Sequence, residues 1–141
     1  MSKQTVAEIL EAYALWDDMV RKKQAEIDRR RSRKTSTKTI YGESRGGIPE
    51  SMADYAAEMD LLDRDLDDLK EERFKAYSEI MRLALQLKSQ RQFDIIYRRN
   101  IHRDTWRRIC WDLDIKRSTA TDLHARAVRA LEAINGERLN P

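Results

Sequence analysis

The sequence predicts an all-α protein, with a long N-terminal helical hairpin or coiled coil followed by a group of shorter helices. Apolar residues recur at spacings of three and four over most of the 141 residues, as they do along one face of a helix. Sustained period-two alternation, which would indicate strands, is nearly absent. Only 4 Gly and 2 Pro occur, and most of them fall in one short stretch, so long uninterrupted helices are permitted.

The first predicted helix occupies residues 1–31, starting near Lys3 and ending near Arg31. Its apolar residues share one helical face, and they are Val6, Ile9, Leu10, Tyr13, Trp16, Val20 and Ile27. This stripe fades after Val20, where a basic run begins: residues 21–45 hold 10 basic and 3 acidic residues. Two interpretations of this basic run stay open, a solvated helix face and an arm that contacts phosphates.

Residues 32–51 are predicted to form a loop or linker, because they contain three of the four glycines and a proline. Ser51 then offers a hydroxyl that can cap the next helix, with Asp54 three residues later at the capping-box position. A new helix is therefore expected to start at about residue 52.

Residues 52–90 form the second long helix of the prediction, ending near Lys88. Eleven positions alternate at three and four residues, and nine of them are Met, Tyr, Leu or Ile, which is a heptad seam. The positions are Met52, Tyr55, Met59, Leu62, Leu66, Leu69, Arg73, Ala76, Ile80, Leu83 and Leu87. Such a seam needs a partner, either the first helix folded back as a hairpin or a second copy of the chain in a homodimer through 52–88. Residues 54–72 hold 9 acidic and 2 basic residues, which can pair with the basic end of the first helix.

The remaining region, 91–136, is predicted to contain three helices. The first ends near Arg98, the second spans about 105–113 after a cap at Asp104 or Thr105, and the third spans 117–134. Residues 114–116 form the turn, and Gly136 is expected to stop the last helix. The predicted inward residues are Trp106, at the centre of this core, and Ile109, Cys110, Leu113, Ile115, Ala120, Leu123, Ala127, Leu131 and Ile134.

A short helix, a three-residue turn and a longer helix are typical of a helix-turn-helix, which places the start of its second helix in the major groove of double-stranded DNA. Side chains expected to read base edges there are Arg117, Ser118, Thr119, Thr121, Asp122 and Arg126. Side chains expected to contact phosphates are Arg98, Arg99, Arg103, Arg107, Arg108, Lys116 and Arg129. The region 91–141 holds 11 basic and 7 acidic residues, which suits a polyanionic partner.

A known family shares this pattern. The run Trp106-x-x-Ile109-Cys110-x-x-Leu113-x-Ile115-x-Arg117-Ser118-Thr119-Ala120, with Leu123-His124-x-Arg126-Ala127-x-x-Ala130-Leu131, resembles region 4, the promoter-reading domain of bacterial sigma factors. The order of the whole chain resembles phage late-gene regulators of the ArpU and RinA type. Three positions depart from the sigma pattern, because Cys110, Asp114 and Lys116 stand where Ala, Gly and Ser are usual. The resemblance implies binding upstream of a phage packaging or late operon and activation of transcription.

Several other classes of function find no support in the sequence. The single cysteine, Cys110, excludes an intrachain disulfide and a zinc site built from several cysteines. His102 and His124 lack the neighbours of a metal site, and no carboxylate pair marks a catalytic cleft. No cofactor and no enzyme activity are expected. The N-terminus lacks the apolar run of a signal peptide, and no segment is apolar enough to span a membrane. The expected location is the cytoplasm of a bacterial host.

Three functional hypotheses follow. In the first, the protein is a DNA-binding transcription regulator of phage or prophage origin, whose long heptad helix pairs two subunits or contacts RNA polymerase. In the second, it is a small terminase subunit for phage DNA packaging, although such proteins usually carry their helix-turn-helix at the N-terminus. In the third, it is a helical adaptor whose acidic face binds a basic partner and which has no affinity for DNA.

Overall fold

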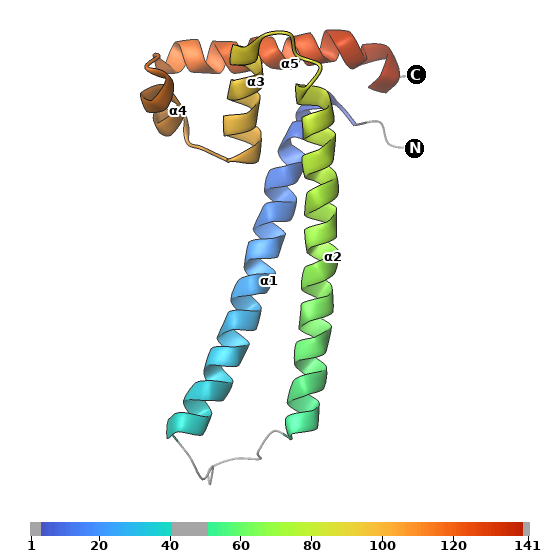
Figure 1. The fold of residues 1–141 in the computed structure, drawn as a ribbon, viewed down its shortest axis with the longest axis vertical. Coiled ribbons are helices and arrows are strands. Elements are labelled where there is room, and N and C mark those ends of the chain that lie inside the picture. The colour runs from blue at the N-terminus through green and yellow to red at the C-terminus, as the bar shows by residue number, and fades with distance from the viewer. Residues whose placement is uncertain (1–3, 41–50, 140–141) are drawn as a thin grey trace. The chain divides into compact units, whose positions relative to one another are not determined.

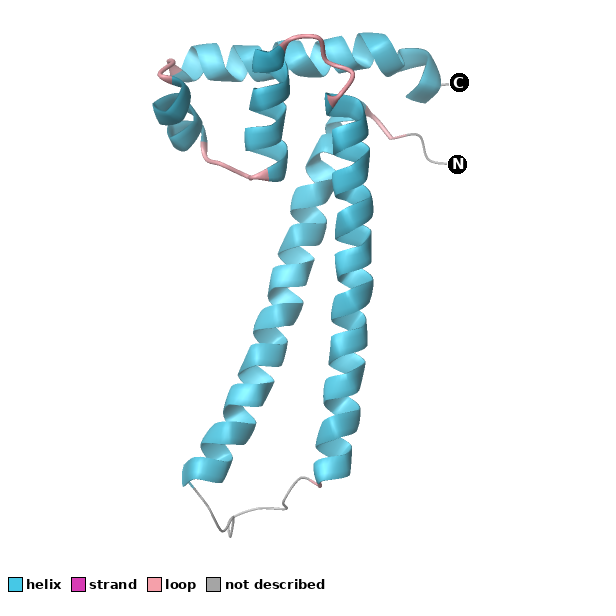
Figure 2. Cartoon of the chain, viewed as in Figure 1, coloured by secondary structure: helices cyan, strands magenta, loops and turns pink. Residues whose placement is uncertain are grey.

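The computed structural model describes the backbone of residues 4–40 and 51–139, and the side chains of residues 4–33 and 51–136. In this part of the chain every regular element is helical, which confirms the all-α prediction (Figure 2). The elements, labelled as in Figure 1, are α1 (Val6–Ile40), α2 (Met52–Ala84), α3 (Gln90–Ile96), the π-helical segment η1 (Tyr97–Ile101), α4 (Trp106–Leu113) and α5 (Arg117–Leu139).

The chain divides into two compact units. Unit 2 is one continuous stretch, Asp17–Glu72, whereas unit 1 joins Met1–Trp16 to Arg73–Pro141. Helices α1 and α2 each contribute residues to both units. The C-terminal helices therefore share a unit with the start of α1 and the end of α2. This differs from the predicted division, in which residues 91–136 stand as a domain of their own.

Unit 2 is a helical hairpin in which α1 and α2 run side by side in opposite directions (Figure 1). Val20 and Ile27 of α1 pack with Met59 and Leu66 of α2, and these four side chains are buried. Of the predicted seam, Tyr55, Leu62 and Leu69 are partly buried beside them, whereas Met52 is exposed. The predicted hairpin partner is therefore confirmed for this unit.

Opposite charges border this hairpin, as the sequence predicts. Lys23 lies 3.9 Å from Asp65, Arg30 lies 3.0 Å from Glu58, and Arg31 lies 3.6 Å from Asp63. The hydrogen bond from Arg30 lowers the pKa of the Glu58 carboxyl below its ordinary value. Ion pairs as exposed as these each contribute little to the stability of the fold. Because α1 is mostly basic here and α2 mostly acidic, these charges favour the association of the two helices.

Unit 1 has a larger core that gathers side chains from every helix. Figure 1 shows α5 crossing α3. Tyr13 of α1 meets Tyr77 of α2 with ring centroids 6.3 Å apart. The buried side chains are Val6, Ile9, Leu10, Ile80, Leu83, Ala84, Ile95, Ile96, Ile101, Ile109, Ala120, Ala127 and Leu131.

Both predicted ends of the first helix are wrong. It begins at Val6 instead of Lys3, because Thr5 and Glu8 form a capping box: each side chain accepts a hydrogen bond from the other residue's backbone N–H, both at 3.1 Å. It ends at Ile40 instead of Arg31. Residues 32–40 contain neither glycine nor proline, so nothing local stops propagation of the helix. Of the predicted loop, residues 41–50 lie outside the described residues.

The second helix starts as predicted and ends early. The backbone N–H of Asp54 donates to the Ser51 hydroxyl at 3.0 Å, which confirms Ser51 as the cap. The helix ends at Ala84 instead of near Lys88. After it, the backbone N–H groups of Gln86 and Leu87 bond to carbonyls three residues earlier, as in a turn of 3₁₀ helix. The Ser89 hydroxyl then accepts from the N–H of Gln92 at 3.3 Å and starts α3. The sequence contains this Ser-x-x-Gln cap, which marks a new helix.

The last helix passes through its predicted stop. Helix α5 continues beyond Gly136 to Leu139. Asn135 is buried at 1% exposure, and its amide donates to Leu131 O at 2.9 Å and to Gln86 Oε1 at 2.6 Å. Asn135 therefore continues the inward stripe four residues after Leu131. Ile134, predicted to face inward, is 46% exposed.

Candidate nucleic-acid interface

Helix α4 and its turn form as the sequence predicts. Thr105 caps α4, its hydroxyl accepting from the N–H of Arg108 at 3.1 Å. Ile109 of α4 is fully buried, and Ile115 in the turn packs against the same core. Asp114 adopts a left-handed conformation (φ 53°, ψ 52°) and its N–H bonds to Cys110 O. Glycine adopts this conformation at no steric cost, which explains its usual place at this position.

The first turns of α5 present a polar surface to solvent. Ala120 and Ala127 are fully buried, which fixes the inward side of the helix. The residues predicted to read bases that are exposed on the other side are called here the outer face of α5: Arg117, Ser118, Thr119, Asp122 and Arg126. Thr121 differs from these, because it is only partly exposed and its hydroxyl donates to the carbonyls of Arg117 and Ser118.

The start of α5 also offers backbone donors. Lys116, the residue before the helix, has a side chain that only donates hydrogen bonds and so cannot cap the first N–H groups. The backbone amides of the first helical turn and the positive end of the helix dipole favour an anion at this point. Lys116, Arg117 and the amides therefore place positive charge together at the start of α5.

Three predicted arginines are held by carboxylates. Arg98 and Arg108 both contact Asp112, at 3.2 and 3.0 Å, and Arg126 contacts Asp122 at 3.0 Å. Arg108 and Arg126 keep about two thirds of their side-chain area exposed. Exposed pairs of this kind are weak, so a phosphate can replace the carboxylate at small cost. The pairing also neutralises Asp122, which would otherwise repel a polyanion.

Arg99 lies in a different environment from the other arginines predicted to contact phosphate. Its guanidinium donates to the carbonyl of Asp104 at 2.9 Å and stacks over the Trp106 ring, 4.6 Å from the ring centroid. Trp106 is only partly buried, so its predicted place at the centre of this core is wrong. The centre consists of Ile95, Ile96 and Ile109, which have no exposed area. Arg99 therefore fixes the segment before α4.

Asn100 joins three elements of unit 1, and sequence reasoning missed it. Its amide donates to the carbonyl of Leu10 in α1 at 3.3 Å, and its oxygen lies 2.8 Å from His124 Nε2 in α5. The π-helical turn η1 positions Asn100 between these helices. His124 also meets Trp106 edge to face, with centroids 5.7 Å apart. Burial, and then the charge of Arg99, lower the pKa of His124 below 6.5.

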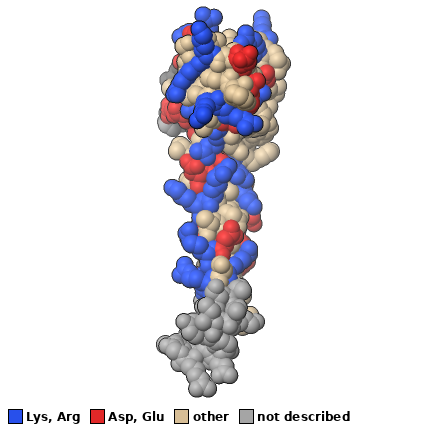
Figure 3. Space-filling view, turned by 90° about the vertical axis from the view of Figure 1, so that its left-hand side faces the viewer, with Lys and Arg blue, Asp and Glu red and all other residues tan. Residues whose placement is uncertain are grey.

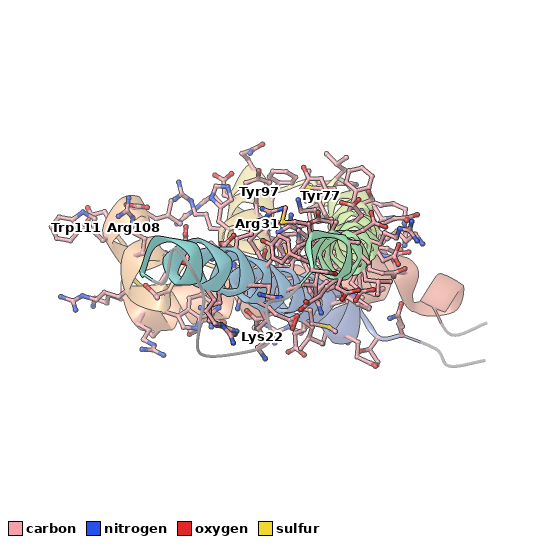
Figure 4. All side chains as sticks on the ribbon, turned by 90° about the horizontal axis from the view of Figure 1, so that it is seen from below. Lys22, Arg31, Tyr77, Tyr97, Arg108 and Trp111 are labelled. Atoms are coloured by element: carbon pink, nitrogen blue, oxygen red, sulfur yellow. The ribbon has the colours of Figure 1, made fainter. Side chains whose placement is uncertain are left out.

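An open cleft runs along the outward side of α4 and reaches the start of α5. Trp111 is 82% exposed, and with Arg108 it projects from the outer side of α4 (Figure 4). The cleft is lined by Thr105, Trp106, Arg107, Arg108, Cys110, Trp111, Asp114 and Arg117. The exposure of Trp111 places it outside the core of unit 1.

The basic residues of α1 in unit 2 differ in their partners. Lys23, Arg30 and Arg31 form the pairs with α2 described above. Lys22 and Arg29 are exposed on a different side of the helix, and Figure 4 shows Lys22 and Arg31 leaving α1 on different sides. Lys and Arg side chains are spaced along the hairpin in Figure 3. Some charges of the basic run are therefore paired within the hairpin and others face solvent.

Other kinds of site find no geometric support in the described residues. No group of three or more His, Cys, Asp or Glu side chains there is arranged to hold a metal ion. Within the same ranges, no helix combines the length and the apolar character that crossing a bilayer requires. Comparisons of the chain with models of protein families, with curated proteins and with solved structures find no match.

Proposed function

We propose that the protein binds double-stranded DNA through the outer face of α5 and regulates transcription. The observation that carries the proposal is the surface at the start of this helix. Short polar side chains and arginines stand exposed over two turns, directly after a three-residue turn from α4. Helices presented in this way enter the major groove, where such side chains read base edges.

The proposed mechanism divides the contacts into two sets. Arg117, Ser118, Asp122 and Arg126 meet base edges, because Ser118 and Asp122 lie on the line opposite the buried alanines. Phosphates are contacted by the backbone amides at the start of α5 and by the surrounding cations, Arg98, Arg103, Arg107, Arg108, Lys116 and Arg129. The first set supplies preference for a sequence and the second supplies affinity that falls with salt.

The resemblance to sigma region 4 and to phage late-gene regulators extends this proposal to its biological setting. In that setting, the protein binds upstream of a late or packaging operon and contacts RNA polymerase. Copies of the chain pair through 52–88, or this segment contacts the polymerase. A packaging role as a small terminase subunit is the competing proposal, and it requires a large oligomeric ring.

Binding to duplex DNA, measured with the mass of the protein in solution, tests the proposal. Labelled random duplexes and duplexes from the neighbouring genome are titrated at 50 and 200 mM salt. A regulator binds as a monomer or dimer, prefers one genomic fragment and loses about 10³-fold or more in affinity between the two salts if six phosphates are contacted. A ring-sized mass would favour the packaging protein. Absence of binding at the lower salt would leave the helical adaptor.

A further inference from the structure

The cleft along α4 combines an exposed aromatic ring with positive charge. Trp111 is 82% exposed, which is the largest value among the exposed large apolar side chains of the described chain. Tryptophan has a large apolar surface, and water contact with that surface is unfavourable. Trp111 packs on no core residue of unit 1, so the fold itself does not account for its position.

Charges around the ring point to a polyanion. Arg107, one helical turn before Trp111, and Arg117, at the start of α5, are exposed and form no ion pair with a described residue. Arg108 adds a third guanidinium, which shares Asp112 with Arg98. Asp114 is the one carboxylate that lines the cleft. Three arginines against one aspartate make the cleft positive.

The spacing suits one strand of a duplex. Arg107 and Trp111 are four residues apart on one helix, which separates their Cβ atoms by about 5–6 Å. Each strand of a DNA duplex advances about 3.4 Å along the axis per phosphate. Ring and guanidinium can therefore meet a sugar and a nearby phosphate on the same strand. Thr105 adds a hydroxyl that accepts a backbone bond within α4 and can still donate its proton to a phosphate.

We propose that this cleft holds the sugar–phosphate backbone of the DNA strand that borders the groove entered by α5, with Trp111 packed against a deoxyribose and Arg107 bound to a neighbouring phosphate, while Arg117 at the end of the cleft reaches the base edges beside that strand. The inference rests on the proposed DNA binding and adds to it a specific backbone site. Trp111 is then a positioning contact that sets how deeply α5 enters the groove.

Substitutions separate the apolar contact from the charge contact. Trp111→Ala should weaken binding to duplex DNA about tenfold at every salt concentration. The substitution removes the apolar surface that the bound DNA would cover, and it removes no charge. Arg107→Gln should instead lower the salt slope by about 0.9, the value for one phosphate contact. Trp111→Phe, which retains a ring, should bind nearly as well as the parent. Phe74→Ala is the matched control, since Phe74 is 66% exposed on α2 in unit 1 and lies outside the cleft.

Tryptophan fluorescence reports the contact directly. Acrylamide quenching of the parent minus that of Trp111→Phe gives the signal of Trp111, and saturating duplex DNA should protect that signal several-fold. If the parent binds DNA while Trp111→Ala binds equally well and Trp111 stays quenchable, this inference is wrong and the proposed function stands. If the parent binds no duplex at 50 mM salt, both fail. If Trp111 becomes protected from acrylamide as the protein concentration rises without DNA, Trp111 lies at a contact between copies of the chain, and the inference is wrong.

Discussion

Asp114 illustrates what a single residue contributes to the turn before α5. Its left-handed backbone (φ 53°) is one that residues with a Cβ adopt at a cost, although aspartate tolerates it better than most. Asp114→Gly should therefore stabilise the protein by about 0.5–1 kcal/mol, reduced by the greater freedom of glycine in the unfolded chain. Asp114→Ala should destabilise it by about 1 kcal/mol.

Urea unfolding of the three proteins checks this order of stability. If Asp114→Gly were less stable than the parent, the side chain of Asp114 would stabilise the turn by more than the left-handed backbone conformation of Asp114 destabilises it. The departure from glycine at this position would then have a structural reason.

The second residue-scale prediction concerns His124 and pH. Burial lowers its pKa, so the folded protein keeps the ring neutral while the unfolded chain takes up a proton near pH 6.5. The unfolded state then binds more protons, and the free energy of unfolding falls as pH drops from about 6.5 towards the lowered pKa. Above pH 6.5 both states hold a neutral ring and this contribution is constant.

Unfolding free energies at pH 7.5 and 5.5 measure this effect. His124→Gln should lose less stability between these two pH values than the parent does. His102→Gln is the control, because it removes the only other histidine, which is exposed. An unchanged pH dependence in His124→Gln would contradict the assignment of the effect to the burial of this ring.

At the scale of elements, the hairpin of unit 2 depends on a thin apolar seam. Leu66 is 6% exposed in that seam, whereas Leu61 on the same helix is 60% exposed. Leu66→Ala should cost about 2–3 kcal/mol, in the lower part of the range for buried leucines because the seam is narrow. Leu61→Ala should change stability by less than about 0.5 kcal/mol. Thermal unfolding followed by circular dichroism compares the two variants, and equal losses would show that the seam is placed wrongly.

The same scale shows which features of the fold the sequence could predict. The inward stripes of α1, α2 and α5 follow from spacing alone, because a helix places every third and fourth residue on one face. Helix ends were harder, since they depend on a few local hydrogen bonds. The caps that pair Thr5 with Glu8 and Ser89 with Gln92 are visible as sequence patterns. The end of α5 is not, because Gly136 predicts a helix stop, whereas the helix continues past it with Asn135 buried against Gln86, a contact that spacing along the chain does not show.

For the candidate site, the sequence predicts which side chains of α5 are exposed, but not which residues form ion pairs and hydrogen bonds with one another. The outward positions of Ser118 and Asp122 follow from helical periodicity, because the buried Ala120 and Ala127 fix the opposite side of α5. The sharing of Asp112 by Arg98 and Arg108 joins residues from two elements, and Asn100 reaches a carbonyl 90 positions earlier in the chain. Sequence periodicity carries no information about contacts of that range.

At the scale of the whole molecule, the distribution of positive charge decides where a polyanion binds. Unit 1 carries exposed cations at the start of α5 and along α4. Unit 2 carries exposed cations such as Lys22 and Arg29 on α1. We propose that DNA is bound by the first of these surfaces, because there arginines stand beside short polar side chains that can read bases, at the start of a helix that follows a three-residue turn.

The most direct test removes two positive charges from each surface in turn. Affinity for duplex DNA is measured across a series of salt concentrations for the parent, for Arg117→Ala with Arg126→Ala, and for Lys22→Ala with Arg29→Ala, after circular dichroism confirms that each is folded. The α5 variant should lose about 2–5 kcal/mol of binding free energy, together with the preference for its best fragment. The α1 variant should lose little and keep that preference. Unchanged affinity in the α5 variant, or an equal loss in the α1 variant, would contradict the assignment of DNA binding to α5.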